Sequence, residues 1–389
     1  MTPARLALLA LAVASVCASE FSSAGVWGLE PQLGLSGDYS SNPALLNAAG
    51  TAESHAALLL DAPTTYVADA FKFSVLPRLR LSNARGYSSL DSDYERVDAR
   101  TEFDTELSVW SASAGVARES SLYRDYLTNG AAGVRRDTGS ADLNWDRHLD
   151  ERTEFTTDLN AQRVSYAAPV GTGTLTDYRY ASLNPGFTWA RSARTKFSAT
   201  AGAGRYDSLD RRTESRSSYA QIGVTHALDA RWSATVTAGY SRALNSLALF
   251  GRRFESTQNG TVFSAALTRS AERSSLTVDA SRQLSPSGFA YLTRQDTYEI
   301  KADHAASERW TLSGAARRTS YRNPIVGGAS YALDITTVDL SAAYLWSRRW
   351  TATLSASRIL EHAGTPAIAI AANSVSLLLS RKFDWTTLQ

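Results

Sequence analysis

Long stretches of this sequence alternate strictly between apolar and polar residues. From Trp232 to Tyr240 every second residue is apolar, and the residues between them are serine, threonine or glycine. Similar runs follow Arg152 and Arg349, and others precede such arginines, as at residues 220–225. A period of two sustained over 8 to 11 residues predicts a β-strand with one apolar face and one wet face.

Short arginine-containing segments separate these runs. The arginines that align the segments are Arg152, Arg194, Arg231, Arg273, Arg309 and Arg349, at spacings of 42, 37, 42, 36 and 40 residues. A period of this length indicates a repeated supersecondary unit. A propeller blade has a similar period but needs four short strands, whereas each period here holds two alternating runs and one long polar connection. Each repeat is therefore predicted to be one β-hairpin, with the arginine segment as its tight turn.

Strand length separates a soluble β-sandwich from a membrane barrel. Strands of soluble proteins are commonly about 5 to 6 residues long, whereas strands that cross a membrane need about 9 to 11. The runs fit the longer class, so we predict an all-β fold: a transmembrane, antiparallel, up-and-down β-barrel with short periplasmic turns and long extracellular loops. Closure of the sheet pairs every backbone N–H and C=O inside the protein, as hydrocarbon requires.

The predicted barrel has about 18 strands, an even number because both termini are expected in the periplasm. The strands are expected near residues 27–39, 66–75, 78–87, 95–104, 107–121, 140–147, 154–166, 178–190, 196–206, 217–226, 232–242, 260–269, 274–284, 295–304, 310–321, 334–346, 350–361 and 373–384. This set places a turn at Leu76-Pro77, because proline cannot donate to a β-ladder. If residues 66–83 form one strand instead, 16 strands are expected.

The tryptophans gather at one end of the predicted strands. The nine are Trp27, Trp110, Trp145, Trp189, Trp232, Trp310, Trp346, Trp350 and Trp385. Each adjoins a predicted short turn or an end of the strand series. Indole prefers the membrane–water interface, and outer-membrane barrels carry aromatic girdles there. The pattern predicts an aromatic girdle at the periplasmic interface.

The first 24 residues differ from the rest of the chain. Arg5 precedes an apolar run from Leu6 to Val16, and small residues follow it. This is typical of a secretory signal peptide, with cleavage after Ala18 or Ala24. The run is too short for a membrane anchor of about 20 residues. We therefore predict a signal peptide over residues 1–24, a β-barrel over residues 25–389, and a location in the outer membrane.

The long connections are expected to alternate with the short turns, as extracellular loops do. They cover residues 40–65, 123–139, 167–177, 207–216, 243–259, 285–294 and 322–333. The first contains NPALLNAAGTAESHAALLL, which has helix-forming residues and little charge. It is expected either to fold inward as a constriction or lid, or to remain a disordered external loop.

The wet face of the strands points into the predicted lumen and carries both signs of charge. Its cations are Arg78, Arg80, Arg96, Arg100, Lys196, Lys301 and Arg317, and its carboxylates are Asp98, Glu102, Asp142, Glu154, Asp158, Asp279, Glu299, Asp303 and Asp339. Mixed signs argue against a strong ion filter. Arg78, Arg80, Arg96 and Arg100 form a candidate basic patch that would attract an acidic polymer, unless nearby carboxylates neutralise it. An 18-stranded lumen is wide enough for water, which favours a channel over a closed polar core.

Signals for catalysis or metal binding are weak. His148, His226 and His304 lie four or five residues before turn arginines of different hairpins, so they are not expected to converge on one ligand. His55 and His362 are expected in loops and are the only candidates for an enzyme acting on lipid or peptide. No catalytic residue, metal site or cofactor is predicted. A net charge of +2 does not indicate a nucleic-acid partner.

One stretch carries a resemblance to a known group of proteins. LEPQLGLSGDYSSNPALL, together with the repeated ERT and ERW turns, resembles outer-membrane β-barrel porins encoded with exopolysaccharide and protein-sorting gene clusters. The resemblance implies an outer-membrane barrel linked to polysaccharide export. The sequence thus predicts a non-enzymatic, porin-like channel whose partners are outer-membrane lipid and hydrophilic solutes or polysaccharide. The alternatives are an outer-membrane enzyme and a closed structural or adhesive barrel.

Overall fold

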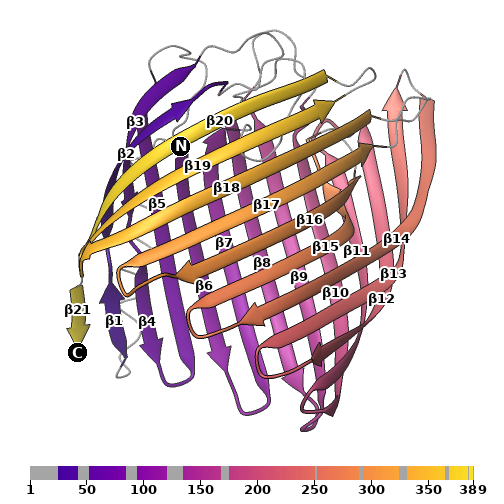
Figure 1. The fold of residues 1–389 in the computed structure, drawn as a ribbon. Helices are drawn as coiled ribbons and strands as arrows, with labels where there is room; N and C mark the ends of the chain where they lie inside the picture. The colour runs from indigo at the N-terminus through magenta and orange to yellow at the C-terminus, as the bar shows by residue number, and fades with distance from the viewer. Residues whose placement is uncertain are drawn as a thin grey trace.

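The strands form one antiparallel sheet that closes on itself as a barrel (Figure 1). The computed structural model describes residues 25–42, 52–84, 94–120, 135–167, 175–249, 252–288, 292–323, 331–363, 368–383 and 385–388. The predicted signal peptide and both of its cleavage positions lie outside these residues. The described part of the chain contains no helix long and apolar enough to span a membrane.

Twenty-one strand segments build 18 wall strands. The segments are β1 (Val26–Leu29), β2 (Gln32–Ser40), β3 (Glu53–Asp61), β4 (Thr64–Ala68), β5 (Phe71–Ala84), β6 (Tyr94–Asp104), β7 (Ser108–Ser120), β8 (Arg135–His148), β9 (Thr153–Tyr166), β10 (Tyr178–Ser192), β11 (Thr195–Ser208), β12 (Thr213–Ala227), β13 (Trp232–Leu249), β14 (Arg252–Ser270), β15 (Ser274–Pro286), β16 (Leu292–Ala305), β17 (Trp310–Asn323), β18 (Tyr331–Ser347), β19 (Trp350–Ala363), β20 (Ile368–Lys382) and β21 (Trp385–Leu388). β1 with β2, β3 with β4, and β20 with β21 are each one interrupted wall strand. The first and last wall strands pair through β1–β21 and β2–β20, which closes the barrel. The predicted all-β barrel of 18 strands is confirmed.

The three interruptions lie side by side on neighbouring strands. They fall at Glu30-Pro31, at Ala62-Pro63 and after Phe383, and backbone hydrogen bonds link them: Glu30 donates to Pro63 over 3.0 Å and Phe383 donates to Pro31 over 2.8 Å. Proline has no N–H and therefore interrupts a ladder. The breaks keep their backbone groups paired because they occur at the same level of adjacent strands.

The predicted turn at Leu76-Pro77 is wrong. β5 runs unbroken through Pro77, and the turn lies earlier, at Asp69-Ala70. Pro77 is tolerated because the neighbouring wall strand is itself interrupted opposite it, where Ala62 donates its N–H to the Pro77 carbonyl over 3.1 Å. The count does not fall to 16, since β3 and β4 supply a wall strand within the predicted first loop. The long connection predicted for residues 40–65, as a lid or as an external loop, is therefore wrong for residues 53–61 and 64–65, which lie in β3 and β4, and residues 43–51 lie outside the described residues.

Two other predicted loops are also wrong. Residues 207–216 hold only a four-residue turn between β11 and β12, and most of residues 243–259 extends β13 and β14, which are 18 and 19 residues long. The prediction depended on apolar alternation, which stops where a strand leaves hydrocarbon. Here the ladder continues beyond that point, because backbone pairing does not require an apolar outer face.

The repeated arginine segments are tight turns, as predicted. In most of them a side chain two residues before the arginine caps the turn: Asp229 Oδ1 accepts the N–H of Arg231 at 2.6 Å and of Trp232 at 2.8 Å. Asp150, Ser192, Ser307 and Ser347 occupy the equivalent position and accept the corresponding N–H groups. Each turn arginine also accepts a hydrogen bond at its carbonyl from a neighbouring strand, at 2.7–2.8 Å; the donors are Ala190, Ala227, Ser270, Ala305, Leu345 and Lys382. The repeat thus encodes both the turn and its link to the next hairpin.

The tryptophans mark the end of the barrel with the short turns. The rings of Trp110 and Trp145 stack with their centroids 5.1 Å apart, and Trp310 packs against Tyr344 at 4.8 Å. Trp346 and Trp350 flank the β18–β19 turn, and the side chain of Trp346 is 68% exposed. Aromatic side chains that face outward at one end of a barrel are typical of a membrane interface, so this end carries the predicted girdle.

Alternation divides each strand between an outer and an inner face. Exposed leucine, valine, isoleucine and aromatic side chains occupy the outer face, as at Ile222 and Leu354, and mostly small polar residues occupy the inner face. Few residues are fully buried. The largest buried cluster joins Val164, Tyr178, Tyr206 and Leu292 and lies inside the barrel at the end opposite the girdle. The interior of the barrel therefore takes the place of a conventional core.

Candidate functional site

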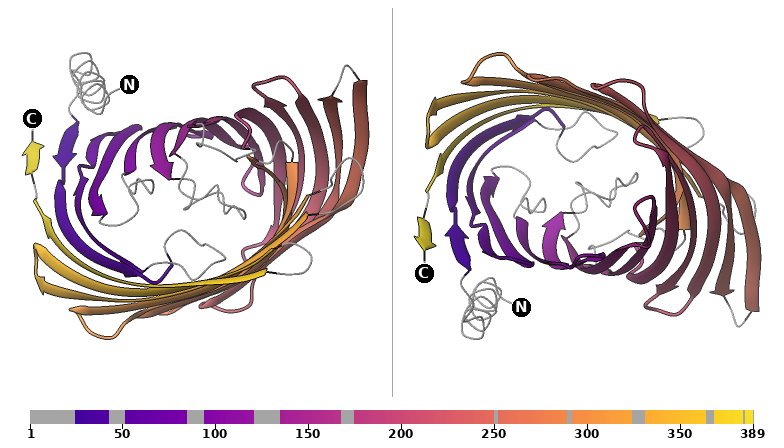
Figure 2. Two further views of the ribbon diagram at one scale, coloured as in Figure 1. Left: turned by 90° about the horizontal axis from the view of Figure 1, so that it is seen from above. Right: turned by 90° about the horizontal axis from the view of Figure 1, so that it is seen from below.

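The inner wall consists of a charged sector and an uncharged sector. Strands β5–β9 carry many of the inward-facing charges, whereas the inner faces of β10–β14 carry mainly serine, threonine, glycine, asparagine, glutamine and tyrosine. Among the described residues, their charged members are Lys196 and, at the far end of β14, Arg252. Seen along the axis, the strands form an oval ring with β12–β14 at one narrow end (Figure 2). The uncharged sector therefore occupies that end of the lumen.

The four arginines of the predicted basic patch lie together on β5 and β6, but carboxylates accompany them. Arg78 is the cross-strand partner of Arg96 on one side and of Asp61 on the other. Arg80 donates to Asp38 Oδ2 at 3.0 Å and lies 3.5 Å from the ring of His55. These pairings reduce the attraction that the patch offers to an acidic polymer, and binding of such a polymer here stays a prediction.

The other two arginines of the patch have partners on their own strand. Arg96 Nε donates to Asp98 Oδ2 at 2.5 Å, and Arg100 lies 3.6 Å from a carboxylate oxygen of Glu102. Asp98 and Glu102, which the sequence places on the same inner face, thus accompany Arg96 and Arg100, as Asp38 accompanies Arg80.

The neighbouring strands β8 and β9 carry acidic side chains without cationic partners. Asp142 accepts hydrogen bonds from Ser113 at 3.1 Å and from Asn160, and Asp158 accepts one from Asn144 at 2.7 Å. Within the described residues, neither carboxylate forms an ion pair with lysine or arginine. Amide and hydroxyl donors stabilise a carboxylate without cancelling its charge. This part of the wall therefore presents a negative potential to the lumen.

The uncharged sector contains a recess that begins at an irregularity in β10. The residues Asn184 and Pro185 interrupt the pairing of β10 with β11, which resumes at Gly186. The hydroxyl of Tyr219, on β12, donates to Asn184 Oδ1 over 3.0 Å, and its ring lies on Gly202. A Cβ at position 202 would fall 2.2 Å from that ring. Glycine is therefore required here for the tyrosine to lie against the wall.

A second tyrosine has a similar setting. A Cβ added to Gly204 would lie 2.8 Å from the hydroxyl of Tyr180. The space in front of the two rings measures about 470 Å³, and it extends to β14 and β15 on the facing wall through Ser264, Ser281 and Gln283. We call this space the tyrosine recess. Apolar ring faces beside hydroxyl and amide groups are suited to binding sugars, which have both apolar and polar faces.

A segment beyond the recess connects the two facing walls. The Tyr206 hydroxyl donates to the Ser287 carbonyl at 3.2 Å, and the N–H of Thr176 donates to the Gly288 carbonyl at 2.9 Å. Ser287 and Gly288 follow β15, whereas Tyr206 lies on β11. The lumen is thus narrowed here by residues 287–288, at a different place from the lid predicted at residues 40–65.

The histidines do not assemble a site. His55 lies on β3 and faces the lumen near Asp38, at 3.7 Å, whereas His362 lies on β19 in the outward-facing register; both were wrongly expected in loops. Side chains on opposite faces of the wall cannot share a substrate. Among the described residues, no group of three histidine, cysteine or acidic side chains is arranged to hold a metal ion.

The tyrosine recess was missed from the sequence. Tyr180 and Asn184 belong to β10 and Tyr219 belongs to β12, two strands away, so the three side chains meet only through register. One signal was present: the Asn184-Pro185 pair inside an otherwise regular strand, where proline marks an edge or an irregularity in the ladder.

Comparison with known proteins supports the fold. No protein-family model matches the chain, and no curated protein matches it significantly. The solved structure of the ferric citrate transporter FecA in its unliganded form is similar, with 8% sequence identity, a TM-score of 0.52, and coverage of 91% of this chain and 78% of FecA. OpdO of Pseudomonas aeruginosa gives 13% identity, a TM-score of 0.50, and coverage of 92% and 98%. The chain has the fold of an outer-membrane β-barrel, in agreement with the predicted location.

Proposed function

We propose that this protein is a porin-like channel of the outer membrane that conducts hydrophilic solutes and has no enzymatic activity. The observation that carries the proposal is the inner wall: a polar, largely uncharged surface on β10–β14 beside an acidic surface on β8 and β9. A closed structural barrel would gain stability from an apolar or fully paired interior. Unpaired carboxylates such as Asp142 and Asp158 are more easily explained by contact with water and ions.

The proposed solutes are neutral carbohydrates, including segments of an exported polysaccharide. The tyrosine recess offers ring faces for stacking and hydroxyl and amide groups for hydrogen bonds. The acidic wall disfavours polyanions by like-charge repulsion. The link to exopolysaccharide export comes from the sequence resemblance, and the lumen chemistry narrows it to chains with little negative charge.

Single-channel recording in a planar bilayer tests this proposal. The purified protein is expected to conduct, and a neutral oligosaccharide such as maltohexaose is expected to interrupt the current. Replacing Tyr219 with Ala removes a ring face and one hydrogen bond, so block should weaken about fivefold, the effect of losing roughly 1 kcal/mol. Tyr240→Ala is the matched control, because Tyr240 lies on the outer face and is 56% exposed there.

Two results would overturn the proposal. Absence of conductance in a correctly folded protein would indicate a closed barrel. Stronger block by an acidic oligosaccharide than by a neutral one at low salt would reverse the proposed solute preference, and would favour a role for the arginines on β5 and β6.

A further inference from the structure

Arginines recur on the outer face near the end of the barrel opposite the girdle. Arg118, Arg163, Arg205, Arg242, Arg282, Arg318 and Arg358 each lie on a strand that runs away from a short turn, and each is an even number of residues from an exposed apolar side chain of its own strand. We call this set the arginine ring. Every member of the ring except Arg118 lies 9 or 11 residues after the turn arginine of its own hairpin. The repeat unit therefore encodes the ring.

Beneath one part of the ring, small residues hollow the outer surface. Cross-strand pairing aligns five alanines from β6 to β10, which we call the alanine row: Ala99, Ala114, Ala141, Ala161 and Ala181. Exposed Leu143, Leu159 and Leu183 form the next row toward the girdle. The resulting trough has a volume of about 740 Å³ and contains Gly139 as well. Such a trough is lined almost entirely by apolar atoms.

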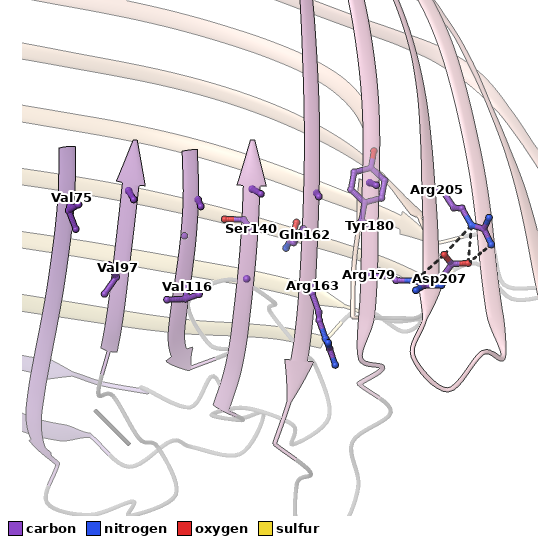
Figure 3. Close-up of a pocket in the computed structure, with 17 residues that line it drawn as sticks. Val75, Val97, Val116, Ser140, Gln162, Arg163, Arg179, Tyr180, Arg205 and Asp207 are labelled. Carbon is purple, nitrogen blue, oxygen red and sulfur yellow. Dashed lines mark hydrogen bonds and ion pairs between the residues drawn. The ribbon is translucent and has the colours of Figure 1, made fainter. Parts of the chain in front are cut away.

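Arginines border this trough on the side away from the leucines. Figure 3 shows Val75, Val97 and Val116 along one part of the trough and Arg163, Arg179 and Arg205 along the other. The trough therefore combines an apolar floor with a cationic margin.

The margin has more cations than its carboxylates neutralise. Arg163 and Arg179 are direct cross-strand partners, and so are Arg205 and Arg216. Like charges directly opposite each other destabilise a sheet. Two carboxylates serve these arginines: Asp207 lies 3.3 Å from Arg179 and 3.0 Å from Arg205, and Glu214 lies 3.4 Å from Arg205 and 2.8 Å from Arg216. The exposed Arg163 has no ion pair with any described residue. An anion between these arginines would relieve the repulsion.

The height of the margin matches the edge of a membrane. Arg163 lies eight residues beyond Phe155, which packs edge-on against Trp145 in the girdle. Eight residues extend about 26 Å along a strand, or about 20 Å along the axis for a tilt of about 40°, close to the roughly 25 Å apolar band of such barrels. The arginines thus lie near the outer edge of the apolar band, from which their long side chains reach the headgroups of the outer leaflet, and the alanine row lies among acyl chains.

We propose that the trough binds a phosphorylated lipid of the outer leaflet. Its acyl chains lie on the alanine row, and its phosphate bridges Arg163, Arg179 and Arg205. Guanidinium groups bind phosphate through paired charge-assisted hydrogen bonds, and small side chains leave room for the methylene chain. The rest of the arginine ring attracts anionic headgroups without a trough to hold their chains.

A second copy of the chain fits the trough less well. It would have to bring free carboxylates to Arg163 and Arg179. Outward carboxylates at this level of the wall, among them Asp137, Asp207, Glu214, Glu95, Asp296 and Asp334, already pair with arginines of their own chain. A lipid phosphate carries the required charge without that constraint.

Native mass spectrometry of the detergent-solubilised protein tests the site, with diphosphorylated lipid A, phosphatidylethanolamine and inorganic phosphate as separate probes. Retention of lipid A is expected, and the Arg163→Gln/Arg179→Gln variant should bind it about tenfold more weakly, as loss of two charge-assisted contacts implies. Filling the trough by Ala141→Leu/Ala161→Leu, which keeps every arginine, should also reduce retention. Arg242→Gln/Arg358→Gln removes two ring arginines outside the trough and is the matched control.

The outcomes are distinct. Loss of lipid A retention in both trough variants, with retention unchanged in the control, supports the proposal. The proposal would be overturned if the control lost as much lipid A as the trough variants. It would also be overturned if inorganic phosphate alone displaced the lipid, or if the filled variant retained lipid A as the native protein does. A shift from dimer to monomer in the trough variants, with lipid retention unchanged, would show an interface between copies. Retention of native heat-modifiable migration in gels checks that each variant has folded.

Discussion

At the scale of single residues, the inner wall contains a buried ion pair. Arg136 Nη1 donates to Glu119 Oε1 at 2.6 Å, and the two side chains are 7% and 5% exposed. Removing one partner leaves the other charge in a place that water reaches poorly, which typically costs about 3–5 kcal/mol. We therefore expect Glu119→Ala to lower the free energy of unfolding by about that amount, measured by urea titration of the protein refolded in micelles.

The matched test replaces both partners. Glu119→Met/Arg136→Met removes both buried charges and keeps most of the volume, so it should recover most of the stability lost in Glu119→Ala. If the double variant is as unstable as the single one, the pair does not act through uncompensated charge.

The facing of individual side chains could be predicted, but their partners could not. Alternation alone placed Arg78, Arg80, Arg96 and Arg100 on the inner face of adjacent strands. The partner of Arg80 is Asp38, 42 residues earlier, and the two meet only because β3 lies between β2 and β5. Such contacts depend on register, which a one-residue slip would change completely.

At the scale of the element, the turns carry titratable caps. Backbone N–H donors of Arg152 and Thr153, together with the Thr153 hydroxyl, lower the pKa of the exposed Asp150 carboxyl, and those of Arg231 and Trp232 do the same for Asp229. A lowered folded-state pKa gives stability that is fully present above the unfolded value of about 3.9 and is lost as the pH falls through the folded value. The turns should therefore weaken in acid.

The variant Asp150→Asn/Asp229→Asn isolates this effect, because asparagine keeps the Oδ1 acceptor but cannot titrate. Between about pH 5 and about pH 3, the native protein should lose more stability than the variant. The measurement is the difference between their urea midpoints at the two pH values. An equal loss in both proteins would show that the acid sensitivity comes from other carboxylates.

The elements themselves were predicted wherever hydrocarbon imposes apolar alternation. β13 is predicted to end at Arg242, because the following residues ALNSLAL break the alternation of apolar and polar positions, and the strand in fact continues to Leu249. The sequence predicts a loop in place of β3, because the run AALLL hides the alternation. Pro77 predicts a turn, since a sequence does not reveal that the neighbouring strand is broken at the same level. The strand predictions thus fail where the backbone pairs without a matching alternation of apolar and polar side chains.

At the scale of the whole molecule, the net charge of the chain is close to zero, but the positive and negative side chains occupy different surfaces. The chain has 40 basic and 38 acidic residues, yet the unpaired carboxylates of β8 and β9 face the lumen and the arginine ring faces outward. On the two proposals made above, the interior favours cations and neutral solutes, whereas the outer rim favours lipid phosphate. One wall can have an acidic inner surface and a cationic outer rim because successive residues of a strand face opposite sides of the sheet.

This arrangement predicts opposite outcomes for one charge placed at adjacent positions. Ile222 is 73% exposed on the outer face, and Gln221 lines the tyrosine recess on the inner face of the same strand. Ile222→Arg places a cation in lipid and should cost about 2–4 kcal/mol near the bilayer midplane, whereas Gln221→Arg remains in contact with water. Urea unfolding in phospholipid vesicles measures both. Equal destabilisation would contradict the assignment of the two faces, and the channel proposal would fail with it, because its lumen would no longer be the polar side of the wall.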